Sequence, residues 1–297
     1  MKLAYTVIIA GLMFAVVACR HEGSLDGLSD KEKLEVLDYR IEQHPDSHEL
    51  LAKRAQVLLN LGRTNEAMAD AEKAVKIESS NVDYKILLAD IRFAGGDADG
   101  SYSALADAER LDPENDEVQL KLGEVAFYRH NYERALQCLS KVTEADPDNR
   151  TALFMKAFIY EETGDTSNAI VLLRKVCDLY PDYAPAFEHL GVIYSYKGNN
   201  LAEDYLGAAI RIDSTNTNAM YALAMYYQGK EQYDKAEAFY NKMLAVNPNS
   251  ADAMNNMGWI EKEVYGDDGR AKEWFERALQ ADPTNEAAQK NMSLYQK

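Results

Sequence analysis

The five histidines of this chain are spread along it, at His21, His44, His48, His130 and His189. Only His44 and His48 lie close together, and we interpret them as flanking a solvated turn rather than holding a metal ion. The stretch GDADG at 96–100 lacks the spaced ligands and the final glutamate of a calcium loop. No glycine-rich phosphate loop, His-Glu-x-x-His pair or Gly-x-Ser-x-Gly elbow occurs. We therefore predict no catalytic residue, no metal site and no cofactor, and no enzyme.

Two of the three cysteines, Cys138 and Cys177, are too far apart in the sequence to indicate a zinc site or a disulfide framework. We predict that they lie on separate helices and fill small apolar spaces. A disulfide between them is the alternative.

The third cysteine, Cys19, ends an apolar segment. Lys2 precedes an apolar run to Ala18 that is shorter than the roughly 20 residues needed to cross a bilayer. This pattern is typical of a secretory signal, and an uncleaved membrane anchor is the alternative. The residues VVAC at 16–19 resemble a bacterial lipobox. The resemblance implies a lipoprotein signal peptide at 1–18 and acylation of Cys19, whose several acyl chains would give stable anchoring.

Residues 19–29 would then be a short lipidated tether. Because Arg20 is not aspartate, resemblance to enterobacterial sorting implies the outer membrane. The sequence thus predicts a lipid-anchored protein of the bacterial cell envelope, although it does not indicate whether the chain faces the periplasm or the outside.

The charge balance narrows the class of partner. With 49 acidic and 32 basic side chains, the formal net charge is −17. A surface of that sign repels phosphate backbones, so we expect no nucleic acid partner. The charge also serves solubility.

One short pattern recurs through the chain and sets its organisation. It appears as IESSN at 77–81, LDPEN at 111–115, ADPDN at 145–149, IDSTN at 212–216, VNPNS at 246–250 and ADPTN at 281–285. The interval is 33 to 35 residues when it is counted on the proline or serine of the pattern, at Pro45, Ser79, Pro113, Pro147, Pro181, Ser214, Pro248 and Pro283. Such a fixed interval indicates a repeat architecture. We predict that the proline or serine follows the end of one helix and that Asp148 or Asn149, in the fourth repeat, caps the next helix.

Three further columns repeat in step. The first contains only glycine or alanine, at Ala55, Ala89, Gly123, Ala157, Gly191, Ala224 and Gly258. The second is small, at Ala67, Ser101, Ala135, Ala169, Ala202, Ala236 and Ala271. The third is mostly bulky, at Ala71, Leu105, Leu139, Leu173, Leu206, Tyr240 and Phe275. Small residues allow two helices to cross closely.

These columns and the 34-residue interval resemble the tetratricopeptide repeat. The resemblance implies an all-α solenoid, a right-handed superhelix of about seven helix-turn-helix units with terminal helices. It covers residues 30–297, with a leading helix at 30–45, repeats over about 46–284 and a closing helix at 285–297. Asn291, Gln289, Gln296 and Lys297 are expected to solvate the far side of the closing helix. In the fourth repeat we expect helices at about 151–162 and 167–179, joined by a turn at 163–165.

In such a solenoid the first helix of each repeat lines the concave face. One concave column, from Gln56 to Trp259, is polar or acidic in three repeats and apolar in four. The lysine–asparagine clamp for acidic peptide tails is not matched. We predict an acidic groove mouth at Asp90 and Glu124. The predicted partner-binding residues are Phe127, Tyr128, Phe154, Phe158, Val192, Tyr196, Tyr221, Met225 and Trp259. The alternative is that Phe158 and Met225 pack against adjacent helices and Trp259 against the closing helix.

These expectations favour a membrane-anchored scaffold that binds a protein or peptide partner. By resemblance, it would act in outer-membrane assembly, secretion or peptidoglycan-related complexes. The alternative function is a ligand-binding component of an envelope uptake system, which an enclosed pocket would favour.

Overall fold

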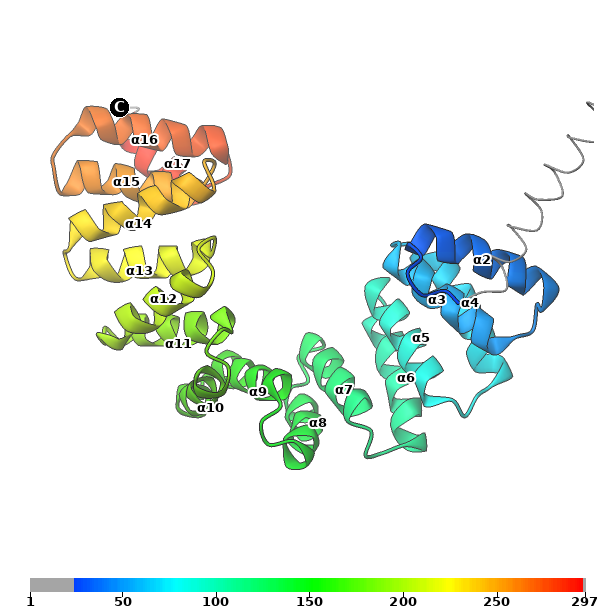
Figure 1. The fold of residues 1–297 in the computed structure, drawn as a ribbon. Helices are drawn as coiled ribbons and strands as arrows, with labels where there is room; N and C mark the ends of the chain where they lie inside the picture. Colours follow the sequence, from blue (N-terminus) through cyan, green and yellow to red (C-terminus); the bar gives the residue numbers. More distant parts are fainter. Residues whose placement is uncertain (1–23, 296–297) are drawn as a thin grey trace, which may run out of the picture. The chain divides into compact units, whose positions relative to one another are not determined.

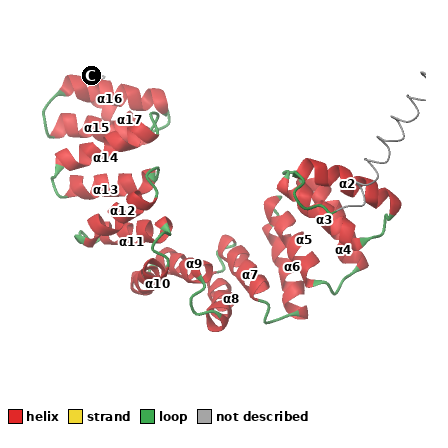
Figure 2. Cartoon of the chain, in the orientation of Figure 1, coloured by secondary structure: helices red, strands yellow, loops and turns green. Residues whose placement is uncertain are grey.

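The computed structural model describes residues 24–295, so the predicted signal peptide, Cys19, Gln296 and Lys297 lie outside the described residues. Within 24–295 the structure has 16 α-helices and no strand (Figure 2). No helix in this range is both long and apolar enough to cross a membrane. The all-α prediction is confirmed.

The helices divide into two compact units, one ending at Pro147 and one beginning at Asp148. The N-terminal unit contains α2 (Asp30–Gln43), α3 (His48–Asn60), α4 (Thr64–Ile77), α5 (Val82–Ala94), α6 (Ala98–Leu111), α7 (Asp116–Tyr128) and α8 (Tyr132–Ala145). The C-terminal unit contains α9 (Arg150–Glu162), α10 (Thr166–Leu179), α11 (Ala184–Tyr196), α12 (Leu201–Ile212), α13 (Thr217–Gly229), α14 (Tyr233–Val246), α15 (Ala251–Glu263), α16 (Asp268–Ala281), α17 (Glu286–Met292) and the 3₁₀ turn η1 (Ser293–Tyr295).

Within each unit, consecutive helices pair as hairpins (Figure 1). The repeats are α3–α4, α5–α6 and α7–α8 in the N-terminal unit, and α9–α10, α11–α12, α13–α14 and α15–α16 in the C-terminal unit. Helix α2 packs against α3 as the predicted leading helix. The fourth-repeat helices begin one residue earlier than predicted, at Arg150 and Thr166, and Gly164 forms the turn between them with a φ of +81°.

The three sequence columns meet inside the hairpins. All their members are buried. A Cβ added to Gly123 would lie 2.8 Å from the Leu139 side chain, and one added to Gly258 would lie 2.7 Å from Phe275. The small first column therefore faces the bulky third column across each of these crossings, which explains why both columns recur.

The recurring pentapeptides end on helix-capping residues. Each final side chain accepts a hydrogen bond from the backbone amide three residues later, at Asn81, Asn115, Asn149, Asn216, Ser250 and Asn285. The prediction that Asp148 or Asn149 caps α9 is confirmed for Asn149. Among the first helices of the repeats, α11 is the exception, because Tyr183 at its N-cap makes no side-chain cap bond and Pro185 occupies the first turn.

The closing helix is shorter than expected. Helix α17 ends at Met292 and continues as a 3₁₀ turn, with the Ser293 hydroxyl donating to the Lys290 carbonyl at 2.7 Å. Asn291 does not solvate the far side: its amide donates to Asn255 Oδ1 on α15 at 2.9 Å. That part of the expectation is wrong, because the buried Asn255 needs a partner from the closing helix.

Cys138 and Cys177 lie on α8 and α10 and are both free and buried, as predicted. Burial raises the pKa of each thiol, that of Cys177 to about 12. Both side chains therefore act as small core residues.

Candidate partner-binding face

The candidate site lies on the first helices of the C-terminal unit, α9, α11, α13 and α15. In each helix one predicted residue directly follows a buried small residue of the first column: Phe158, Val192, Met225 or Trp259. Successive helix positions are rotated by about 100°, so these side chains leave the hairpin core. None of the four is fully buried, and Met225 is 40% exposed. We call this surface the first-helix face.

Side chains of α9 contact His189 of α11 on this face. The rings of Phe154 and Phe158 approach the His189 ring edge-on, at centroid distances of 5.4 and 5.2 Å. His189 Nδ1 lies 2.8 Å from Glu161 Oε2. Burial alone would lower the pKa of His189, but the hydrogen bond and charge of Glu161 outweigh it and raise the pKa. Phe158 thus packs on an adjacent helix, as the alternative interpretation stated.

Tyr196 is the most exposed aromatic residue of the face. It is the last residue of α11 and is 89% exposed. On the same helix, Val192 is half-buried and packs at the edge of the core. An aromatic side chain left in water at this degree of exposure contributes little to folding and remains available for contact with a partner.

Helices α13 and α15 meet through Tyr221 and Asn256. The Asn256 amide lies 3.5 Å from the Tyr221 hydroxyl and also donates to the Asp252 carbonyl at 2.9 Å. The hydroxyl of the buried Tyr240 donates to Gln228 Oε1 at 2.8 Å and lies 3.1 Å from the sulfur of Met225, which is 40% exposed. The centre of the first-helix face, on α13, carries no Asp, Glu, Lys or Arg side chain.

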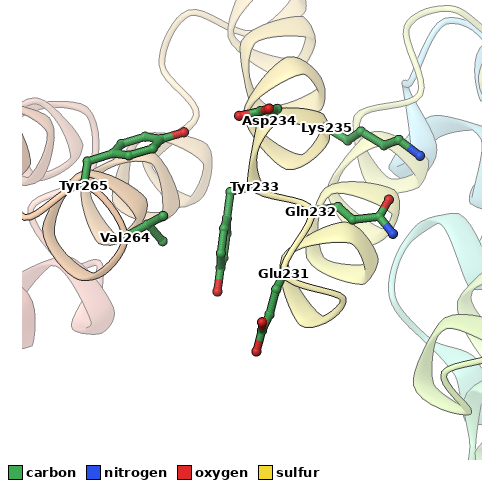
Figure 3. Close-up of a pocket in the computed structure, with 7 residues that line it drawn as sticks. All are labelled: Glu231, Gln232, Tyr233, Asp234, Lys235, Val264 and Tyr265. Carbon is green, nitrogen blue, oxygen red and sulfur yellow. The ribbon is translucent and has the colours of Figure 1, made fainter.

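Trp259 lies at the C-terminal end of the face. Its ring centroid is 6.4 Å from that of Tyr233 on α14. Tyr233 also lines a surface pocket of about 320 Å³, together with Tyr265 and Val264 (Figure 3).

The N-terminal unit holds the remaining predicted residues. Asp90 accepts from Lys121 Nζ at 2.8 Å, so its charge is balanced within the protein. Glu124 is exposed. Tyr128 is 62% exposed with its ring edge-on to Phe93, and Phe127 packs on Tyr132. Of the two carboxylates predicted at the acidic mouth, Asp90 is engaged by a lysine.

Sequence reasoning missed three contributors to the C-terminal unit's surface: His189, Asn256 and Tyr233. His189 and Asn256 stand three residues before Val192 and Trp259, so they fall on the same side of their helices. That spacing could have identified them. Tyr233 carried no such signal, because it belongs to a second helix. Within residues 24–295, no three His, Cys, Asp or Glu side chains group to hold a metal ion.

Comparison with known proteins places these hairpins in a family. Residues 48–81, 120–184 and 217–250 match family models described as tetratricopeptide repeat. A stretch of 97 residues is 30% identical to the human E3 SUMO-protein ligase RanBP2 (Homo sapiens), covering 33% of this chain and only 3% of that protein.

Solved structures agree on the fold. A tetratricopeptide repeat protein from Parabacteroides merdae has a TM-score of 0.64 at 16% identity, over 84% of this chain and 99% of that chain. YrrB, described as a TPR protein with an unusual peptide-binding site, has a TM-score of 0.52 at 23% identity, over 64% of this chain and 98% of its own. The repeat fold is generally a non-catalytic fold for protein interaction. The chain therefore contains tetratricopeptide repeats in these three segments and has the fold of a tetratricopeptide-repeat solenoid, which suits a protein–protein interaction scaffold.

Proposed function

We propose that this chain is a lipid-anchored scaffold of the bacterial cell envelope that binds a protein or peptide partner on its first-helix face. The observation that carries the binding part is the row of incompletely buried apolar side chains on α9, α11, α13 and α15, with Tyr196 89% exposed. Soluble proteins seldom leave aligned aromatic and aliphatic side chains in water unless a surface is used for contact.

The partner segment would be an extended or helical peptide with hydrophobic anchors. The first-helix face offers this peptide two exposed anchors, Tyr196 on α11 and Met225 on α13. Two pairs of ionisable side chains beside this face are engaged within the protein, His189 with Glu161 and Lys262 with Glu263. Binding there would consequently rest on apolar burial more than on ion pairs.

The anchoring part of the proposal rests on the sequence. Residues VVAC at 16–19 follow an apolar run and resemble a lipobox, and Arg20 favours the outer membrane. In this proposal the chain gathers partners near a membrane, in outer-membrane assembly, secretion or peptidoglycan-related complexes. Nucleic acid is not a proposed partner, because the net charge is −17, and no catalytic activity is assigned.

Uptake of a small ligand is the less favoured function. The pockets found among residues 24–295 open broadly to solvent and do not enclose a ligand. Small-molecule sites usually bury most of the ligand surface. The open surface supports a protein partner instead.

Site-specific photocrosslinking in cells tests the binding part. A photoreactive phenylalanine analogue at Tyr196 is expected to give a discrete adduct, which Met225→Ala should weaken. The matched control is the same analogue at Val171, a 64% exposed apolar residue on the second helix α10. An adduct of equal strength at both positions, or none at Tyr196, would contradict partner binding on this face.

Metabolic labelling with a fatty acid tests the anchoring part independently. The wild-type chain is expected to incorporate label and fractionate with membranes, whereas Cys19→Ala should lose both properties. Label retained in Cys19→Ala would refute lipidation at this residue.

A further inference from the structure

A pocket in the C-terminal unit lies beside Trp259, at the C-terminal end of the first-helix face. It forms between the turn that joins α13 to α14 and the end of α15 (Figure 3). Residues 231–235 supply one side, and Val264 and Tyr265 supply the other. The volume, about 320 Å³, suits one side chain of a partner.

The walls of the pocket are aromatic and aliphatic. Tyr233 extends into the opening, and Val264 and Tyr265 stand opposite it (Figure 3). Two tyrosine rings from different repeats therefore flank the same space. The face of a tyrosine ring carries partial negative charge, which attracts a cation within about 6 Å of its centroid.

The rim of the pocket carries acidic side chains that lack a cation. Neither Glu231 nor Asp234 forms an ion pair within 4.0 Å in the described part of the chain. The one cation of the lining, Lys235, points away from the opening (Figure 3). Its Nζ lies 4.7 Å from the centroid of Tyr227 and 4.0 Å from Glu203, so it is engaged elsewhere.

Two more carboxylates, those of Glu261 and Glu237, lie near Tyr265 of the pocket. Glu261, one helical turn before Tyr265, is 6% exposed, and its Oε2 has no hydrogen-bond partner. Burial, together with the charges of Glu261 and Asp234, raises the pKa of Glu237. Among residues 24–295, the cation that forms an ion pair with Glu261 is the exposed Arg270, whose Nη1 lies 3.3 Å from the Glu261 carboxylate. The pocket thus lies in a field of negative charge that the described residues balance only in part.

We propose that this pocket receives the ammonium or guanidinium of a lysine or arginine side chain from the protein partner. Tyr233 and Tyr265 would hold the aliphatic stem and the face of the cation, and Asp234 and Glu231 would supply the opposing charge. This inference rests on the proposed function, because the cation belongs to the partner.

The pocket lies close enough to the first-helix face for one partner to contact both. Tyr233 contacts Trp259, the last predicted residue of the first-helix face, at a ring distance of 6.4 Å. A peptide anchored on Met225 and Trp259 would place a neighbouring basic residue beside the pocket. The basic end of the partner would then lie next to the seventh repeat, whereas the sequence had suggested an acidic mouth in the first three.

The test uses small probes and does not need the partner. Binding of N-acetyl-lysine methylamide to the purified chain is followed by NMR through the ring resonances of Tyr233 and Tyr265. The neutral analogue N-acetyl-norleucine methylamide, of nearly equal shape, is the ligand control. The lysine probe is expected to shift both rings in a saturable, salt-sensitive manner, and the norleucine probe to shift neither.

A charge variant completes the experiment. Asp234→Asn should weaken binding of the lysine probe roughly threefold or more, whereas Asp204→Asn, an exposed carboxylate on α12, should leave it unchanged. Equal shifts by both probes, or no loss of affinity in Asp234→Asn, would overturn the inference. Probe binding without a crosslinked partner at Tyr196 would refute the proposed function and leave the cation pocket standing.

Discussion

Gly191→Ala tests the packing rule that holds each hairpin together. A Cβ at this position would lie 2.6 Å from Leu206 Cγ and 2.8 Å from both Leu206 Cδ2 and the Leu206 backbone nitrogen. Ordinary contacts to a Cβ begin at 3.4 Å. Because a backbone atom is involved, α12 must move as a whole, and a side-chain rotation cannot relieve the overlap. Overpacking of this kind costs about 1–3 kcal/mol, offset by about 0.5–1 kcal/mol from replacing a helical glycine. At the middle of both ranges the net loss is about 1 kcal/mol.

The matched control is Gly229→Ala. Gly229 ends α13, has no heavy atom within 4 Å of an added Cβ, and does not have a positive φ. This variant should be neutral or more stable by up to about 1 kcal/mol. The fourth repeat has alanine at this column position, so Ala157→Gly removes a Cβ there and should lower the free energy of unfolding by about 0.5–1 kcal/mol.

Two measurements decide the outcome. Urea unfolding followed by circular dichroism gives the change in the free energy of unfolding. Repeat arrays can unfold in parts, so amide hydrogen exchange should locate the loss of protection in α11 and α12. If Gly191→Ala unfolds at the wild-type urea concentration with unchanged protection, the close crossing does not explain the glycine–alanine column.

Three other substitutions test single contacts. Ser101 stands where the other repeats have alanine in the second column, and its buried Oγ has no hydrogen-bond partner. Ser101→Ala should therefore leave the free energy of unfolding in urea unchanged or raise it by about 1 kcal/mol. A loss of stability would contradict the absence of a partner. Asn149→Ala removes the α9 cap and should cost about 1 kcal/mol, and an unchanged unfolding midpoint would contradict the capping role. Burial lowers the pKa of His189, but the hydrogen bond and charge of Glu161 outweigh this effect and raise the folded pKa above 6.5. The pair of His189 and Glu161 therefore stabilises the fold fully below about pH 6.5 and loses this contribution as pH rises through the folded pKa. The stability difference between wild type and His189→Gln should therefore be larger at about pH 6 than at about pH 8.5, and equal differences would refute the linkage.

The fold was predictable because its constraints lie within one repeat. The pairing of a small residue with a bulky one, as in Gly191 with Leu206 or Ala157 with Leu173, recurs in the sequence because each hairpin must bring the same two columns together. The final asparagine of ADPDN has a local role as well, since its cap bond spans only three residues. Helix α17 was predicted too long, because the 3₁₀ turn at its end depends on a local hydroxyl bond that helix propensity does not reveal.

The candidate site was predictable only in part. Helical spacing placed Phe158, Met225 and Trp259 on one side of their helices, but it could not tell that Phe158 packs on His189 while Met225 stays exposed. The charge of Asp90 also looked available in the sequence, yet Lys121, 31 residues later, engages it.

The sequence by itself determined the repeat length, the buried columns, the caps and the order of the hairpins, because those features depend on neighbours within about one repeat. Only the tertiary structure decided which side chains of successive repeats meet. Tyr233 and Tyr265 share a pocket, and Lys235 turns away from it (Figure 3). The physical reason is that the rotation of one hairpin on the next sets these contacts, and that rotation follows from the packing of whole surfaces.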